Sequence, residues 1–188
     1  MKIEIVKKLY LKKMKNSKEE NIVELFIDNE IDLFSKYSIR KKDSVGNTNS
    51  KINNDIIDYL VNEVKIIPIK NRLKIYLKVV TKIINDNDLI SKMIKNNVIE
   101  KITIINKRIN KININSLLFA LLGMLFIGVT QVLQFIEKRY SLNEFVIVMS
   151  WVFMWKAVDL MFFERAELMK EKGILLKIFF SEINIQKN

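Results

Sequence analysis

Two charged residues, Lys156 and Asp159, stand inside the apolar and aromatic stretch SWVFMWKAVDLMFFER, Ser150 to Arg165. Their spacing of three residues places both side chains on one face of a helix, where a cation and a carboxylate attract. A charge at mid-bilayer costs at least about 2.5 kcal/mol, and pairing or contact with headgroups reduces that cost. The pattern leaves three interpretations open: a snorkelling lysine with a short-range ion pair, a polar contact inside an oligomeric bundle, or a pore.

Other polar and aromatic residues lie inside apolar segments. Gln131 and Gln134 fall in an earlier apolar run and can hydrogen-bond across helices. In an antiparallel pair of helices they lie at the opposite depth from Lys156 and Asp159, so the two groups are not expected to meet. Trp151 and Trp155 are four residues apart, share a face, and are expected to pack against another helix.

Enzymatic chemistry has few candidates. The chain has no His and no Cys, which excludes thiol nucleophiles, disulfides, histidine acid–base catalysis and nearly all zinc or haem sites. HEPN-type ribonucleases in their usual form are excluded for the same reason. The glycines are isolated and build no phosphate loop. The sequence therefore predicts no enzyme, no cofactor and no metal site, although a site made of carboxylates alone stays open.

The net charge of +11 favours an anionic partner. Compositional drift explains it as well, because Lys, Asn and Ile are all abundant, as in an AT-rich genome. A membrane surface and nucleic acid are the other two interpretations. In RLKIYLKVV, apolar residues alternate with polar ones, which predicts a half-buried strand with a basic face. A possible nucleic-acid surface on that face comprises Arg72, Lys74, Tyr76 and Lys78.

Two apolar segments predict a transmembrane hairpin spanning 116–163. The segment Ser116–Ile136 has no charged residue, and a helix of about 20 residues covers the roughly 30 Å of a bilayer core. The second segment, Phe145–Phe163, is interrupted only by Lys156 and Asp159. The polar turn EKRYSLNE joins them. The alternative is a buried hairpin of a soluble protein, but residues 1–115 are too polar to wrap both helices.

Lysines and arginines near the spans predict the orientation. Such residues cluster before the first span and after the second, whereas two in the turn are matched by two glutamates. Because cytoplasmic flanks carry the excess of Lys and Arg, we expect both termini in the cytoplasm and the protein in a bacterial inner membrane.

Residues 1–97 are expected to form a small α+β cytoplasmic domain, mostly helical with at least one strand. Ser17 to Glu20 fits a capping box, followed by apolar residues at helical spacing up to Phe34. The polar stretch 38–54 predicts a mobile loop. A helix is expected from Asn54 until just before Pro68, and another at 85–97. The strand needs partners, for which KIEIV near the start and EINIQ near the end are candidates.

A juxtamembrane helix is predicted at 98–115, although alternating isoleucines leave a strand open. β-branched residues spaced four and three apart form a short heptad seam, typical of three- or four-stranded oligomers. The seam comprises Val98, Ile102, Ile105, Ile109 and Ile112. Residues 164–188 are expected to form a charged cytoplasmic tail.

The segment YLVNEVKIIPIKNRLKIYLKV, followed by the apolar hairpin and WVFMWKAVDLMFFER, resembles a family of uncharacterised bacterial membrane proteins. The resemblance covers roughly Tyr59 to Ile183. It implies a cytoplasmic domain, a two-span hairpin and a charged C-terminal extension, and it implies no site residues.

Together these observations favour a non-enzymatic, homo-oligomeric inner-membrane protein. Its cytoplasmic domain would bind a protein partner or a signal and couple it to the hairpin in the lipid bilayer. Two outcomes are open, membrane permeabilisation by a phage-defence effector or the anchoring of a partner. The alternative is a membrane-tethered accessory protein that binds nucleic acid.

Overall fold

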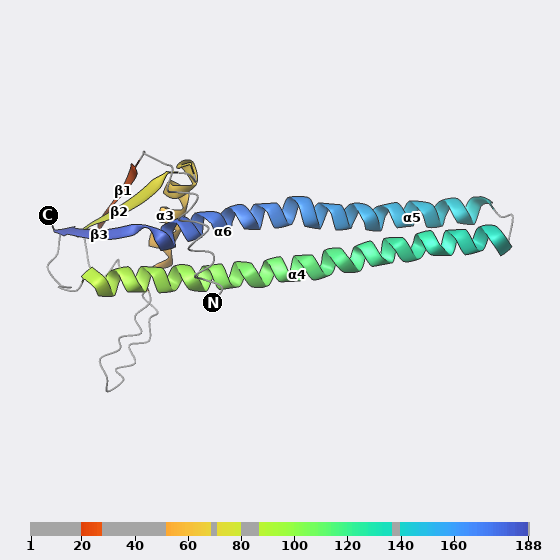
Figure 1. Cartoon of the computed structure of the whole chain (residues 1–188), viewed down its shortest axis with the longest axis horizontal. Coiled ribbons are helices and arrows are strands. Elements are labelled where there is room, and N and C mark those ends of the chain that lie inside the picture. Colours follow the sequence, from red (N-terminus) through yellow and green to blue (C-terminus); the bar gives the residue numbers. More distant parts are fainter. Residues whose placement is uncertain (1–19, 28–51, 69–70, 80–86, 137–139, 188) are drawn as a thin grey trace, which may run out of the picture. The chain divides into compact units, whose positions relative to one another are not determined.

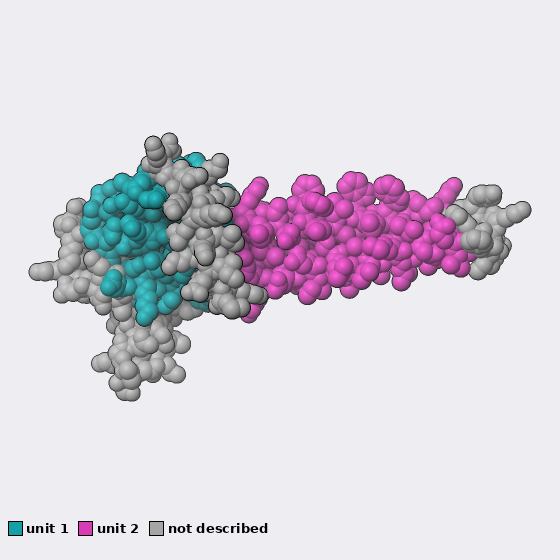
Figure 2. Space-filling view, viewed as in Figure 1, with its two compact units in different colours: residues 1–102, 173–188 teal, residues 103–172 magenta. Residues whose placement is uncertain are grey.

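The chain is described by a computed structural model, which is mostly helical with a small parallel sheet and two long apolar helices (Figure 1). This combination confirms the predicted fold class at that level. The residues that the structure describes are 20–27, 52–68, 71–79, 87–136 and 140–187, without the side chains of residues 79, 87, 89, 133–136, 140–143 and 187. Figure 2 colours two compact units, one of Met1–Ile102 with Gly173–Asn188 and one of Thr103–Lys172.

The first unit contains a three-stranded sheet in the order β1-β2-β3, with both strand pairs parallel. The strands are β1 (Glu20–Ile27), β2 (Arg72–Val79) and β3 (Glu182–Lys187). The register places Val23 beside Ile75, and Ile75 beside Ile183. The predictions of a strand at RLKIYLKVV and of EINIQ as its partner are confirmed, whereas KIEIV lies outside the described residues.

The helix predicted from Ser17 is wrong over Glu20–Ile27, which forms β1. Val23 and Ile27 are four residues apart, a spacing that keeps two side chains on one face of a helix and also on one face of a strand. Leu25 between them is buried as well, so the actual period is two. The β-branched residues and Phe26 favour a strand, and pairing with β2 stabilises it.

Helix α3 (Asn54–Ile66) contributes its buried side chains, Ile57, Leu60 and Val64, to the core of the first unit. It begins where predicted, because the Asn53 side chain accepts a hydrogen bond from the Asp55 N–H at 3.2 Å, and it ends before Pro68. Most of the predicted loop at 38–54 lies outside the described residues, but Ile52 within it is buried. The unit's core includes Ile57, Leu60, Val64, Leu73, Ile75, Leu77, Leu175 and Ile178.

Helix α4 (Asn87–Ile136) is continuous over 50 residues. The helix predicted near 85–97, the juxtamembrane segment 98–115 and the first apolar segment all belong to it. The alternative of a strand at 98–115 is therefore wrong. The side chains of Ile90, Ile94 and Val98 are buried in the first unit, so the start of α4 belongs to its core.

The returning limb consists of three consecutive segments. Helix α5 (Tyr140–Asp159) is followed without a gap by the π-helical turn η1 (Leu160–Glu164) and by helix α6 (Arg165–Phe180). Residues 164–188, predicted as a charged tail, instead contribute α6 and β3, because ILLKIFF supplies apolar side chains that the first unit buries.

In the second unit, α4 and α5 run side by side in opposite directions (Figure 1). The Ser116 hydroxyl donates to the Ala157 carbonyl oxygen at 3.0 Å, and the rings of Phe126 and Phe153 stack with centroids 5.3 Å apart. Gly123 lies against Met154, at a position where even a Cβ atom would be 2.8 Å from Met154 Cγ. Small residues therefore allow the two helices to approach closely.

The outward surface of this pair is apolar. Two helical segments, Ile90–Val132 and Glu144–Phe180, are long and apolar enough to cross a membrane. Only 11% and 17% of their most apolar windows are buried, whereas a core helix of a soluble protein is mostly buried. Exposed apolar residues include Leu117, Leu121, Met124, Leu125, Trp151 and Trp155.

Candidate functional site

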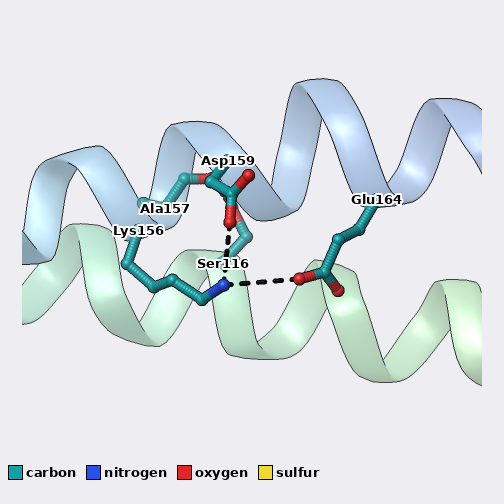
Figure 3. A network of polar contacts seen from close by, with 5 residues as sticks. All are labelled: Ser116, Lys156, Ala157, Asp159 and Glu164. Atoms are coloured by element: carbon teal, nitrogen blue, oxygen red, sulfur yellow. Dashed lines mark hydrogen bonds and ion pairs between the residues drawn. The ribbon is translucent and has the colours of Figure 1, made fainter.

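A cluster of three charged side chains lies on the returning limb. The Lys156 ammonium donates to Asp159 Oδ2 at 2.8 Å and to Glu164 Oε1 at 3.3 Å (Figure 3). The spacing of three residues pointed to the first contact, and the structure places those two residues together. Glu164 is a third member that the sequence analysis missed.

The π turn explains how Glu164 reaches Lys156. In a regular α-helix, residues eight apart are offset by about 80° around the axis, which is not a shared face. The turn η1 is wider, with the Arg165 N–H bonded to the Leu160 carbonyl oxygen, so each residue in it rotates by less. The smaller rotation returns Glu164 to the face of Lys156.

The cluster is open to its surroundings. The side chains of Lys156, Asp159 and Glu164 are 45%, 47% and 47% exposed. One ammonium faces two carboxylates, so the group carries a formal charge of minus one when all three are ionised. Because the ammonium lies between two carboxylates, this geometry favours charge compensation within the cluster.

The predicted intramembrane glutamines do not join this cluster. Gln131 is exposed on α4, beyond Gly123 in the direction away from Ser116, and Ser116 is the residue that contacts Ala157. The side chain of Gln134 lies outside the described part. Trp151 and Trp155 are 62% and 63% exposed, so contact with a further helix stays a prediction for them.

The predicted oligomer seam contributes to the packing of the single chain. Val98, Ile105 and Ile109 are 0%, 4% and 7% exposed, while Ile102 and Ile112 are half-buried. The heptad spacing therefore has an explanation within one chain, because these side chains face its other elements. An oligomer contact through the seam stays a prediction.

The basic face of β2 lies next to acidic residues of β1. Lys74 and Lys78 form ion pairs with Glu20 at 2.9 Å and with Glu24 at 2.7 Å. The Glu20 hydrogen bond raises the pKa of Lys74, and the reciprocal bond lowers the pKa of the Glu20 carboxyl. The register places Glu20 opposite Arg72 and Glu24 opposite Tyr76, so each glutamate reaches its lysine diagonally across the two strands.

These ion pairs reduce the positive charge that the face offers to a phosphate. Arg72 is exposed and Tyr76 is half-buried between the two lysines, whereas the Lys78 ammonium also lies 4.9 Å from the ring centroid of Phe26. Binding of nucleic acid through Arg72, Lys74, Tyr76 and Lys78 stays a prediction.

Lys177 is a buried cation that the sequence analysis did not single out. It is 1% exposed, and its ammonium donates to the carbonyl oxygens of Pro68 at 2.8 Å and Ile67 at 3.4 Å. Burial lowers the pKa of Lys177. The available signal was a single lysine in the apolar run ILLKIFF, the same kind of signal that identified Lys156.

No family model matches the chain, and no curated protein or solved structure is similar to it. The resemblance to an uncharacterised membrane family therefore stays a hypothesis, and function must be argued from the geometry.

Proposed function

We propose that this chain is a non-enzymatic protein of the bacterial inner membrane whose helix pair crosses the bilayer as a hairpin. One observation carries the proposal: two helices long enough to cross a bilayer leave their most apolar windows 89% and 83% unburied, as the 11% and 17% buried shares imply. Each exposed large apolar side chain is a cost in water and a gain in lipid.

The polar groups of the pair are arranged as lipid requires. Ser116 donates to the Ala157 carbonyl across the pair, while Thr130 and Ser150 donate to carbonyl oxygens one turn back in their own helices, at 2.6 Å and 2.7 Å. A hydroxyl in a bilayer core has no water to bond, so such internal acceptors are needed. Lys156 is compensated by two carboxylates and lies near the end of its span.

The flanking charges favour a cytoplasmic location for both ends of the hairpin. Before the first apolar segment stand Lys107, Arg108 and Lys111, and after the second stand Arg165 and Lys170. Segments rich in lysine and arginine remain on the cytoplasmic side. On this proposal the sheet is cytoplasmic, and the turn between α4 and α5 faces the opposite side of the membrane.

The continuity of the helices supports a coupling role. α4 contributes Ile94 and Val98 to the core of the first unit, and Lys101 on α4 forms an ion pair with Asp58 on α3. At the other end α6 contributes Ile178. A partner or signal that repacks this core biases helices that continue into the hairpin, because packed elements shift as units. Permeabilisation of the bilayer and anchoring of a partner are the two outputs, and exposed tryptophans on α5 suit contact with a second copy.

The test uses the absence of native cysteines. The full chain is expressed in bacteria, and membranes are washed with alkaline carbonate. We expect the chain to stay in the membrane pellet. A cysteine placed at the start of α5, Ser141→Cys, should react with an impermeant maleimide added to intact spheroplasts. A cysteine in β3, Gln186→Cys, should react only after lysis.

Two results would contradict the proposal. Release of the chain by carbonate would show that the helix pair does not cross the bilayer. Reaction of Gln186→Cys in intact spheroplasts would reverse the orientation. A depolarisation dye in the same cells separates the two outputs, since a permeabilising effector changes the membrane potential on induction and an anchor does not.

A further inference from the structure

An open hollow of about 380 Å³ lies within the second unit, beside η1. That volume falls in the range of small-ligand sites. One wall is a single face of α4, and the other is formed by η1 and the first turns of α6. Its lining is Arg108, Lys111, Ile112, Asn115, Leu160, Glu164, Glu167 and Leu168.

Opposite charges are segregated on the two walls. Arg108 and Lys111 belong to α4, whereas Glu164 and Glu167 belong to the η1–α6 wall. Within the described residues no ion pair joins one wall to the other, and the ion pair of Glu164 is with Lys156 outside the hollow. The hollow therefore offers a positive wall and a negative wall separated by unfilled space.

We propose that this hollow binds the headgroup of a zwitterionic phospholipid that carries a primary ammonium, a phosphoethanolamine headgroup. The phosphate would face Arg108 and Lys111, and the ammonium would donate to Glu164 and Glu167. The proposal rests on the proposed function, because only a membrane-spanning pair places residues 108–115 and 160–168 at the level of the headgroups.

The chemistry of the walls discriminates between headgroups. A purely anionic headgroup meets the arginine and lysine but is repelled by the two carboxylates. A choline headgroup has the same charges but no N–H, so it cannot donate hydrogen bonds to Glu164 or Glu167. The apolar part of the lining, Ile112, Leu160 and Leu168, suits the glycerol end of the acyl chains.

The experiment measures which lipid the full-length protein retains. The chain is reconstituted in nanodiscs with equal amounts of phosphatidylethanolamine, phosphatidylglycerol and phosphatidylcholine, then extracted into mild detergent and analysed by native mass spectrometry. We expect retained phosphatidylethanolamine to exceed each of the other two. Equal retention of the three lipids would overturn the proposal.

A charge reversal with a matched control tests the site itself. Glu167→Lys removes one carboxylate and adds a cation, and it should lower the ratio of retained phosphatidylethanolamine to phosphatidylglycerol by about fivefold, as expected for one partly exposed charge contact. Glu171→Lys makes the same change four residues further along α6, outside the lining, and should leave the ratio unchanged. An equal shift in both variants would mean that net charge sets the preference, and would overturn the site.

Failure of this inference differs from failure of the proposed function. A chain that resists carbonate extraction but shows no headgroup preference lacks the lipid site and still crosses the membrane. If carbonate releases the chain, both the membrane-spanning hairpin and the lipid site are contradicted.

Discussion

Replacing Gly123 should loosen the helix pair, whereas the same change at Gly128 should not. The two glycines lie on the same helix, five residues apart, and both replacements add only a methyl group. Gly123 is buried against α5, while a Cβ at Gly128 meets nothing within 4 Å. Gly128→Ala is therefore a matched control for Gly123→Ala.

The magnitude follows from the contacts. A Cβ at position 123 would lie 2.8 Å from Met154 Cγ, 2.9 Å from Met154 Sδ and 3.3 Å from the Ser150 carbonyl oxygen, whereas ordinary contacts lie at 3.4–4 Å. Overpacking of this kind costs about 1–3 kcal/mol. Alanine in place of glycine gains up to about 1 kcal/mol of helix propensity at either site. We expect Gly123→Ala to be less stable than Gly128→Ala by about 1–3 kcal/mol.

The assay is unfolding of the purified protein in mixed micelles by titration with SDS, followed by circular dichroism and tryptophan fluorescence. Both tryptophans of the chain lie on α5, so the fluorescence reports on this limb. Met154→Ala should rescue Gly123→Ala, because the added methyl then has space, and should give a coupling free energy in a double-mutant cycle. Equal stability of the two glycine variants would refute the close approach of α4 and α5.

Three further predictions concern charged residues. Lys156→Leu leaves Asp159 and Glu164 without their ammonium, and an uncompensated charge in the membrane costs about 2.5 kcal/mol. A smaller fraction of the chain should therefore stay in the membrane pellet after a carbonate wash. Lys156→Leu combined with Asp159→Leu and Glu164→Gln should restore that fraction. Lys177→Met removes the ammonium that donates to the Ile67 and Pro68 carbonyl oxygens, and the loss of hydrogen bonds to this charged group should lower the free energy of unfolding by about 1.5–3 kcal/mol. Burial lowers the pKa of Lys177 below its usual 10.5, so the unfolded chain binds this proton more tightly than the folded chain does. The free energy of unfolding of the native chain should therefore rise as pH increases towards 10.5. Thermal unfolding followed by circular dichroism should show this rise in the native chain and not in Lys177→Met. Lys74 lowers the pKa of Glu20 below 4.5, so this contact stabilises the fold above pH 4.5 and is lost as pH falls through the folded-state pKa. Protection factors of the β1 amides, which compare measured hydrogen exchange with the intrinsic rate at the same pH, should therefore fall on acidification in the native chain, and Glu20→Gln should reduce that pH dependence.

The local sequence pattern was sufficient to predict strand β2 but not strand β1. β2 alternates strictly, with Leu73, Ile75 and Leu77 separated by polar residues, and no helix places such a series on one face. β1 is ambiguous, because Ile22 and Phe26 interrupt the alternation with further apolar residues, both more than half exposed. Its strand conformation depends on pairing with β2, from which it is separated by a long stretch of sequence. Such a pairing is invisible to a pattern within one segment.

In the charged cluster, the sequence predicted the contact of Lys156 with Asp159 but not its contact with Glu164. The spacing of Lys156 and Asp159 reveals their contact, because it is a helical spacing, but residues eight apart share a face only where the helix is irregular. A π turn depends on how a helix packs against its neighbours, and here Leu160 at its start is buried. The third charge therefore became a partner through tertiary packing. It follows that a substitution that converts η1 into regular α-helix should separate Glu164 from Lys156 without altering either charge. The same change should also move Glu164 in the lining of the hollow that we propose to bind a lipid headgroup.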